Sequence, residues 1–460
     1  MEENKIPIEY SGSEAGKEGA QNLKKVLKTR DLVIFGLVFM APVSAQTLFG
    51  ELTQLSQGHA VLSYLVALIA MIFTASSYGK MAGAFPKAGS TYSYTAQAIH
   101  PHIGFIAGWA ILLDYLMMPI LLTRLSAIFT MELFPVIPLW GMLLVFLVPV
   151  TMFNYFGSKV TSRVNLFMTI TMIFSLILFI TFAVKSLTTG VGGIGSVFSL
   201  EGIYNSSTFS MDALISGASI AVLSYLGFDA VTTMAEDSQV TGKMVGKSAI
   251  FALLISSFLY ICQVYFATLV SPNFNSFQSQ DTAFFEVAVS VGGGILATII
   301  TIIIAVSGIS TALAGQSSGS RILFGMGRDE VLPSIFCHLH PKYKTPDYSI
   351  IILAFFGYFG ALFLPLSFIF AIMVFGALIG FISVNLSVFV EFFVKRQERS
   401  GTSLLFHLVF PFLGVIVCGY ILFNMEFIGK VTGVFWVIIG ALLLFVRIKI
   451  LKKEENELSL

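Results

Sequence analysis

A proline and three polar side chains interrupt an apolar segment near the start of the chain. The stretch reads Phe39-Met40-Ala41-Pro42-Val43-Ser44-Ala45-Gln46-Thr47 and lies inside the apolar run 33–54. Proline has no backbone N–H, so a helix that passes through Pro42 leaves a carbonyl of the preceding turn without its usual donor. A second interruption, Ser224-Tyr225-Leu226-Gly227-Phe228-Asp229, lies inside the run 212–236 and combines a glycine with an acid. Both stretches predict helices that are broken partway along.

These two segments belong to a series of apolar runs that continues to the end of the chain. Hydrophobic residues make up 56% of the 460 residues, and charged residues only 11%. A helix needs about 20 apolar residues to cross a hydrocarbon layer about 30 Å thick. We read twelve such runs: 33–54, 61–81, 104–131, 136–154, 164–185, 212–236, 247–270, 293–316, 348–364, 367–392, 404–423 and 428–450. Because lipid offers no hydrogen-bond partner to the backbone, the sequence predicts an all-α integral membrane protein with twelve transmembrane helices.

The lysines and arginines are concentrated in every second connection between the predicted helices. If the N-terminus is cytoplasmic, all but Arg124, Lys185 and Lys430 of the 26 cations lie in cytoplasmic tails and loops. Positive residues gather on the cytoplasmic side of membrane proteins. We therefore expect a multi-pass protein of the inner or plasma membrane with both termini in the cytoplasm. The first thirty residues lack the apolar core of a signal peptide, so we expect them to stay attached.

The two interrupted helices are the first and the sixth of the series, and each opens a block of five. Because five is odd, the second block enters the membrane from the opposite side, as in an inverted repeat. The expected division is a tail 1–30, a first repeat 31–185, an inverted second repeat 212–392, and two extra helices with the C-terminal tail in 393–460. Interrupted helices at matching positions indicate a transporter's binding site. The alternative is that Pro42 and Gly227 serve only helix packing.

Composition and motifs exclude several other classes of function. A net charge of +1 offers no basic surface for nucleic acid. Cys262, Cys337 and Cys418 form no CxxC pair, and Cys337 with His338 and His340 lacks a fourth ligand at the usual spacing, so we expect no metal and no other cofactor. The sequence contains no HExxH and no GxxxxGK[ST], which speaks against zinc hydrolases and ATP-driven pumps. We therefore expect a carrier and no enzyme.

Several motifs resemble those of the amino acid–polyamine–organocation transporters. They are Phe85-Pro86-Lys87-Ala88-Gly89-Ser90-Thr91-Tyr92-Ser93-Tyr94, Leu113-Asp114-Tyr115, Gly227-Phe228-Asp229 followed by Glu236-Asp237, and Ser320-Arg321 with Met326-Gly327-Arg328-Asp329. Within that family, the runs 226–233 and 385–389 are similar to those of bacterial putrescine importers. The resemblance implies a secondary transporter that imports a small amine or amino acid, first a putrescine-like polyamine, with protons as the coupling ion. A permease for neutral or other amino acids, or an exchanger, is the alternative.

The resemblance also implies that helices one and six unwind around the substrate at the bilayer centre. The implied substrate cradle consists of Ala41, Pro42, Val43, Ser44, Ala45, Thr47, Ser224, Tyr225, Leu226, Gly227, Phe228 and Asp229. Unwound carbonyls accept hydrogen bonds from an ammonium group, and the N-termini of half-helices bind anions. Helices one, two, six and seven are expected to rock against a scaffold of helices three, four, eight and nine.

Two positions depart from the implied pattern. Where the putrescine importers carry an acid in helix one, this chain has Thr47. Two ammonium groups need two anionic partners, so a monocation or a zwitterion becomes an alternative substrate. Where some proton-coupled relatives carry a lysine in helix five, this chain has Met172. Another group would then have to carry the coupling proton.

Two acids inside predicted helices are candidates for coupling. Asp114 lies ten residues into the third run, or about 15 Å along a helix, which places it near mid-membrane. An acid at that depth is a functional candidate by default, although a structural bond to a neighbouring helix end is the alternative. Asp229 either contacts the substrate or has a structural or gating role. A membrane enzyme that uses Asp114 and Asp229, or a sensor without transport, is a further alternative.

Four more residues are candidates for gating or for binding an ion. Glu236 and Asp237 either pair with a cation of the following loops (Lys243, Lys247 or Arg328) in an inner gate, or are solvated. Ser307 and Ser310 in the eighth run either bond to the substrate or an ion, or bond to their own helix.

Overall fold

The computed structural model describes residues 25–86, 90–131, 136–190, 192–280, 283–425 and 427–458. Within these ranges the regular elements are helices, together with one isolated β-bridge between Leu27 and Ser238. Residues 1–24 of the predicted tail, and Lys87, Ala88 and Gly89 of the motif after the second predicted helix, lie outside the described residues.

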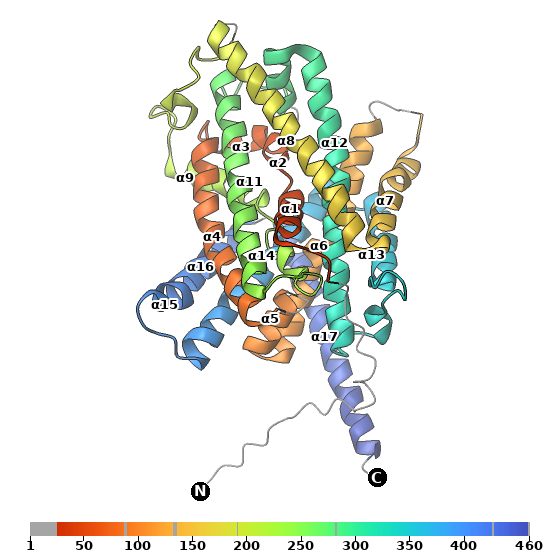
Figure 1. Cartoon of the computed structure of the whole chain (residues 1–460). Coiled ribbons are helices and arrows are strands. Elements are labelled where there is room, and N and C mark those ends of the chain that lie inside the picture. Colours follow the sequence, from red (N-terminus) through yellow and green to blue (C-terminus); the bar gives the residue numbers. More distant parts are fainter. Residues whose placement is uncertain are drawn as a thin grey trace.

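The helices follow one another along the chain with short connections (Figure 1). They are α1 (Thr29–Met40), α2 (Ser44–Thr47), α3 (Phe49–Leu55), α4 (Ala60–Ala84), α5 (Thr91–Ala98), α6 (Pro101–Met131), α7 (Leu139–Phe156), α8 (Ser158–Thr189), α9 (Met211–Leu223), α10 (Ala230–Thr233), α11 (Gly242–Val270), α12 (Ala283–Arg328), α13 (Asp347–Phe363), α14 (Leu366–Val388), α15 (Thr402–Leu404), α16 (Phe410–Asn424) and α17 (Phe427–Leu458). Short 3-10 turns η2 (Leu200–Gly202) and η3 (Ser334–Cys337) and π-helical turns η4 (Phe389–Lys395) and η5 (Leu405–Val409) complete them.

The lengths and apolar composition of these helices fit a membrane protein. Among the described residues, nine helices are long and apolar enough to span a membrane, and the bent pair Thr29–Thr47 with Phe49–Leu55 raises the number to ten. The helices α9 and α13 are apolar but shorter. The prediction of an all-helical, multi-pass membrane protein is confirmed, whereas the predicted twelve spans are reached only if α9 and α13 also cross.

The longest helix, α12, differs from its predicted span 293–316 at both ends. It runs from Ala283 to Arg328 and bends at Gly293, where φ is 70° and ψ is −175°. Only glycine adopts such a backbone without a steric penalty. The predicted apolar run ends at 316, whereas α12 continues as a helix through Arg328. The polar residues of this extension, including Ser318 and Arg321, are buried against neighbouring elements, so packing rather than apolar composition sustains the helix.

The helix α6 occupies the centre of the bundle. It packs against α5, α12 and α14, while α11 lies along α4 and α1 contacts α8, α11 and α12. The helices α16 and α17 are peripheral, and the last turns of α17 project beyond the other helices (Figure 1). The helix α8 crosses the bundle obliquely close to α1 (Figure 1). This packing encloses the interrupted helices within the bundle.

Candidate functional site

The first predicted interruption is present between α1 and α2. The helix α1 ends at Met40 and α2 begins at Ser44, with Ala41 at φ 49° and ψ 102°. A positive φ is uncommon for a residue other than glycine, and it turns the chain out of the helical path. The carbonyls of the last turn of α1 therefore need donors from elsewhere in the molecule.

Two polar side chains from other helices supply some of these donors. The carbonyl of Val38, which would accept from residue 42 in a regular helix, accepts from the Thr311 hydroxyl of α12 at 2.8 Å as well as from the Ala41 N–H at 3.1 Å. The carbonyl of Pro42 accepts from the amide of Gln263 in α11 at 2.8 Å. Side chains of α11 and α12 thus stabilise the break by hydrogen bonds to its carbonyls.

A single tyrosine hydroxyl joins the first break to the second. The fully buried Tyr260 of α11 has its Oη 2.5 Å from the Met40 carbonyl oxygen and 2.8 Å from that of Ser224. The Ala41 carbonyl oxygen lies 3.4 Å from the same atom. Carbonyls from both interruptions therefore converge on one point.

The second predicted interruption separates α9 from α10. The helix α9 ends at Leu223, α10 begins at Ala230, and the residues between them form turns. Gly227 has φ 106°, and a Cβ atom there would lie 1.9 Å from Cδ1 of Phe39 in α1. The absence of a side chain at Gly227 therefore makes room for the last turn of α1.

Polar and aromatic side chains connect the two breaks. The Ser44 hydroxyl donates to Ser224 Oγ at 3.0 Å, and Tyr64 of α4 bonds to the same Oγ at 2.8 Å. The Tyr260 ring lies 5.3 Å from that of Tyr64 and 5.5 Å from that of Tyr225, measured between ring centroids. Carbonyl oxygens beside tyrosine rings form an environment that suits a cation.

Two buried acids, Asp229 at the end of the second break and Asp114 in α6, are further polar groups of the interior. The Tyr115 hydroxyl of α6 donates to Oδ2 of Asp229, and both residues are fully buried. Asp114 is also fully buried, and neither of its oxygens has a hydrogen-bond partner among the described residues. The two acids lie within electrostatic range of each other. Since a buried, unpaired carboxylate is costly, the pair requires protons or cations to be neutralised.

Other predicted site residues have local or apolar surroundings. Thr47 is exposed, and its hydroxyl donates to the Ser44 carbonyl of its own helix at 2.8 Å. Ser307 donates to the Ile304 carbonyl at 2.7 Å and Ser310 to the Ser307 carbonyl at 2.8 Å, so both hydroxyls bond to α12 itself. The cradle residues Val43, Ala45, Leu226 and Phe228 are buried apolar side chains.

The two acids that follow α10 are ion-paired, so the solvated alternative is wrong. Arg328 donates to both carboxylate oxygens of Glu236, at 2.8 and 2.9 Å. Arg321 lies 2.6 Å from Asp237, and both side chains are only 3% exposed. The backbone carbonyl of Asp237 also accepts from the N–H of Leu27 at 3.0 Å. These bonds tie α12, the segment after α10 and the segment before α1 together.

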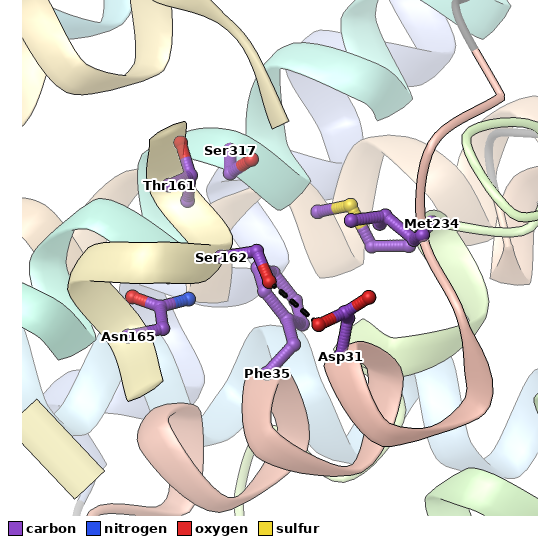
Figure 2. Close-up of a pocket in the computed structure, with 8 residues that line it drawn as sticks. Asp31, Phe35, Thr161, Ser162, Asn165, Met234 and Ser317 are labelled. Carbon is purple, nitrogen blue, oxygen red and sulfur yellow. Dashed lines mark hydrogen bonds between the residues drawn. The ribbon is translucent and has the colours of Figure 1, made fainter. Parts of the chain in front are cut away.

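A small pocket of about 10 Å³ lies beside this junction. It is lined by residues from the start of α1, from the start of α8 and by Ser317 of α12 (Figure 2). Asp31 accepts a hydrogen bond from the Ser162 hydroxyl at 3.0 Å across the pocket wall (Figure 2). The buried amide of Asn165 also lines it. A larger pocket of about 500 Å³ lies near the loop after α12, and neither pocket includes a residue of the two breaks.

Three residues that hold the breaks were not predicted from the sequence. Gln263 carried a usable signal, because it is the one amide side chain in the run 247–270. Thr311 follows the predicted Ser310 by one position and points to α1 instead of its own helix. Tyr260 carried none, because it is one of many aromatic residues in an apolar run.

An all-helical membrane bundle in which two broken helices meet around buried polar and aromatic groups has the architecture of a membrane transporter. The sequence profile of the amino acid permease family matches residues 48–452. The chain therefore belongs to the amino acid permease family, as the resemblance of its motifs implied.

Individual relatives align over nearly the whole chain. The low-affinity putrescine importer PlaP of Escherichia coli K12 is 30% identical over 424 residues, which cover 92% of this chain and 93% of PlaP. The branched-chain amino acid permease BcaP of Bacillus subtilis is 27% identical, with 94% of each chain covered. The methylthioribose transporter of Bacillus subtilis is 24% identical, with 93% of this chain and 94% of the relative covered. The prediction of a transporter and not an enzyme is confirmed.

Proposed function

We propose that this protein imports a small amine or amino acid by alternating access, with a putrescine-like polyamine as the first candidate substrate. The observation that carries the proposal is the convergence of carbonyls from both broken helices at Tyr260, together with the buried acid Asp229 at the end of the second break. Carbonyl oxygens, carboxylates and tyrosine rings all favour an ammonium group. The Escherichia coli relative, a putrescine importer, supports an amine substrate.

The proposed membrane arrangement follows the family pattern. We take α9 with α10 and the short α13 as spans in addition to the ten found by length, which gives twelve helices. Residues 31–185 and 212–392 would then form the two inverted repeats. The protein would lie in the plasma membrane with both termini in the cytoplasm. The distribution of cations along the sequence supports this orientation.

The first test is uptake by the purified protein in liposomes with an imposed inward proton gradient. Radiolabelled putrescine is added outside, with unlabelled amino acids and polyamines as competitors. Accumulation of putrescine that a protonophore abolishes is the expected result. If leucine is taken up but putrescine is not, an amino acid permease replaces the putrescine importer as the proposed function. The similarity to the branched-chain amino acid permease BcaP of Bacillus subtilis supports that alternative. Absence of flux for every amine and amino acid added would contradict the proposal.

Asp114 is the proposed carrier of the coupling proton. Its carboxylate is buried and has no hydrogen-bond partner among the described residues, so the neutral, protonated form fits this environment. Glu236 is less suitable because it is paired with Arg328.

Replacement of Asp114 by asparagine is expected to abolish the protonophore-sensitive accumulation, because an amide cannot release a proton. Exchange of labelled for unlabelled substrate at equal concentrations, which needs no proton gradient, should persist. The exposed Asp212 at the start of α9 offers a matched control, and its replacement by asparagine should leave both activities unchanged. Accumulation by Asp114→Asn at the wild-type level would exclude this residue as the proton carrier.

A further inference from the structure

The carbonyls at the two breaks outnumber the donors that serve them. The carbonyl oxygens of Met40 and Ser224 lie 2.5 and 2.8 Å from Tyr260 Oη, whereas the Ala41 carbonyl, 3.4 Å from the same atom, already accepts from the Ser44 N–H at 2.8 Å. A phenol hydroxyl has one proton, so it donates fully to one of them at a time. The neighbouring Pro42 carbonyl depends in the same way on an amide of Gln263.

Both donors come from the same face of one helix. Tyr260 and Gln263 are three residues apart in α11, which places their side chains one above the other. Both are fully buried, and both reach across to α1. The helix α11 therefore presents a pair of neutral donors to the carbonyls that the break in α1 leaves free.

We propose that Tyr260 and Gln263 are internal stand-ins for the substrate's ammonium group, which displaces them from these carbonyls when it binds. This inference rests on the proposed function, since it requires a substrate with an ammonium group. A primary ammonium carries three N–H donors and can serve several carbonyls at once. Its charge-assisted hydrogen bonds are roughly twice as strong as those of a neutral donor, so it competes successfully.

The stand-ins would set the affinity for substrate. In the empty protein they satisfy buried carbonyls that otherwise lack a donor, which stabilises the empty state. When the substrate binds and displaces the two side chains, this stabilisation is lost, which makes the net free energy of binding less favourable. Removing a stand-in therefore destabilises the empty protein and leaves the loaded protein nearly unchanged, so binding becomes tighter.

The test compares wild-type protein with Tyr260→Phe, purified at full length in detergent. Thermal unfolding is followed with increasing concentrations of putrescine, and in parallel of leucine. Without ligand, Tyr260→Phe is expected to unfold at a lower temperature than the wild type. Its apparent Kd for the ligand is expected to fall by roughly two- to tenfold, the equivalent of one lost neutral hydrogen bond in the empty state.

Tyr265→Phe is the matched control, because Tyr265 lies in the same helix and its hydroxyl bonds to the carbonyls of Val197 and Ser199, away from the breaks. Its Kd should equal that of the wild type. If Tyr260→Phe cannot be recovered folded, Gln263→Met takes its place with the same expectation.

An unchanged or increased Kd in the Tyr260 or Gln263 variant would overturn the inference. If the wild type binds putrescine or leucine and only this shift is missing, the proposed function stands and the stand-in role falls. If the wild type binds neither ligand and transports neither, both fall.

Discussion

Replacing Arg321 by methionine is expected to lower the free energy of unfolding by about 3–5 kcal/mol, because the change removes the cation of a buried ion pair. The Arg321 guanidinium lies 2.6 Å from Asp237, and the side chains are each only 3% exposed. The guanidinium also donates to the carbonyl and hydroxyl of Ser317, so it is held in place on α12. A negative charge that remains buried without this cation is poorly compensated.

The loss should extend to the segment before α1. The Asp237 carbonyl accepts hydrogen bonds from the N–H groups of Val26 and Leu27, at 2.8 and 3.0 Å. A displaced Asp237 therefore loosens the attachment of this segment, and we expect uptake in liposomes to be lost together with stability. Thermal unfolding in detergent and uptake of the proposed substrate measure the two effects.

Two further variants separate the charge from the packing. The double variant Arg321→Met with Asp237→Leu removes both charges, and it should recover most of the lost stability, since apolar residues often replace a buried ion pair without cost. Arg328→Met breaks the partly exposed pair with Glu236, whose side chains are 34% and 19% exposed, and should cost only about 0–1 kcal/mol. Equal losses of unfolding free energy for Arg321→Met and Arg328→Met would contradict the explanation that burial makes the Arg321–Asp237 pair the more important one.

Replacing Gly227 by alanine is the second change with a large expected effect. Its φ of 106° costs an L-residue about 1–2 kcal/mol. In addition, the new Cβ would lie 1.9 Å from Cδ1 of Phe39, and such overpacking costs about 1–3 kcal/mol more. Because Phe39 belongs to the last turn of α1, the clash would push the two breaks apart. We expect lower thermal stability and loss of substrate uptake.

A second substitution at the point of contact tests this explanation. Phe39→Leu removes Cε1 of the three ring atoms that the new Cβ would meet and replaces the rigid ring by a smaller side chain that can rotate away. The double variant with Gly227→Ala should therefore regain part of the stability but keep the backbone strain. Gly419→Ala in α16 is the control, because a Cβ there meets nothing within 4 Å. It should leave stability and uptake unchanged. If the Gly227→Ala variant takes up substrate at the wild-type rate, the explanation that transport requires close packing of α1 against the second break is wrong.

Much of the fold could be predicted because it depends on properties of single residues and short runs. An apolar run of sufficient length has to be helical in lipid, and nine of the described helices meet that criterion. The first interruption also follows from local chemistry, because Pro42 lacks an N–H whatever surrounds it. Gly227 likewise marks the second interruption through a backbone that only glycine adopts easily.

The length of α12 and the ion-pair partners of the charged residues could not be predicted from single residues or short runs of sequence. The end of α12 is rich in small and polar residues and remains helical because it is buried, with Ser320 and Arg321 almost inaccessible. For Glu236 the sequence offered the nearby Lys243 and Lys247 as well as Arg328, and helix packing brings the most distant of them, Arg328, 92 residues away, into contact.

Apolar composition, Pro42 and Gly227 were enough to predict a helical membrane protein and the places where two of its helices break. The contacts of the breaks become apparent only in the folded protein, where Ser44 contacts Ser224, 180 residues away, and Met40 contacts Tyr260, 220 residues away. The physical reason is that apolarity and a missing N–H act locally, whereas a hydrogen bond between distant residues depends on the rotation and offset of two packed helices. No short-range pattern fixes that register, because it results from the packing of the whole bundle.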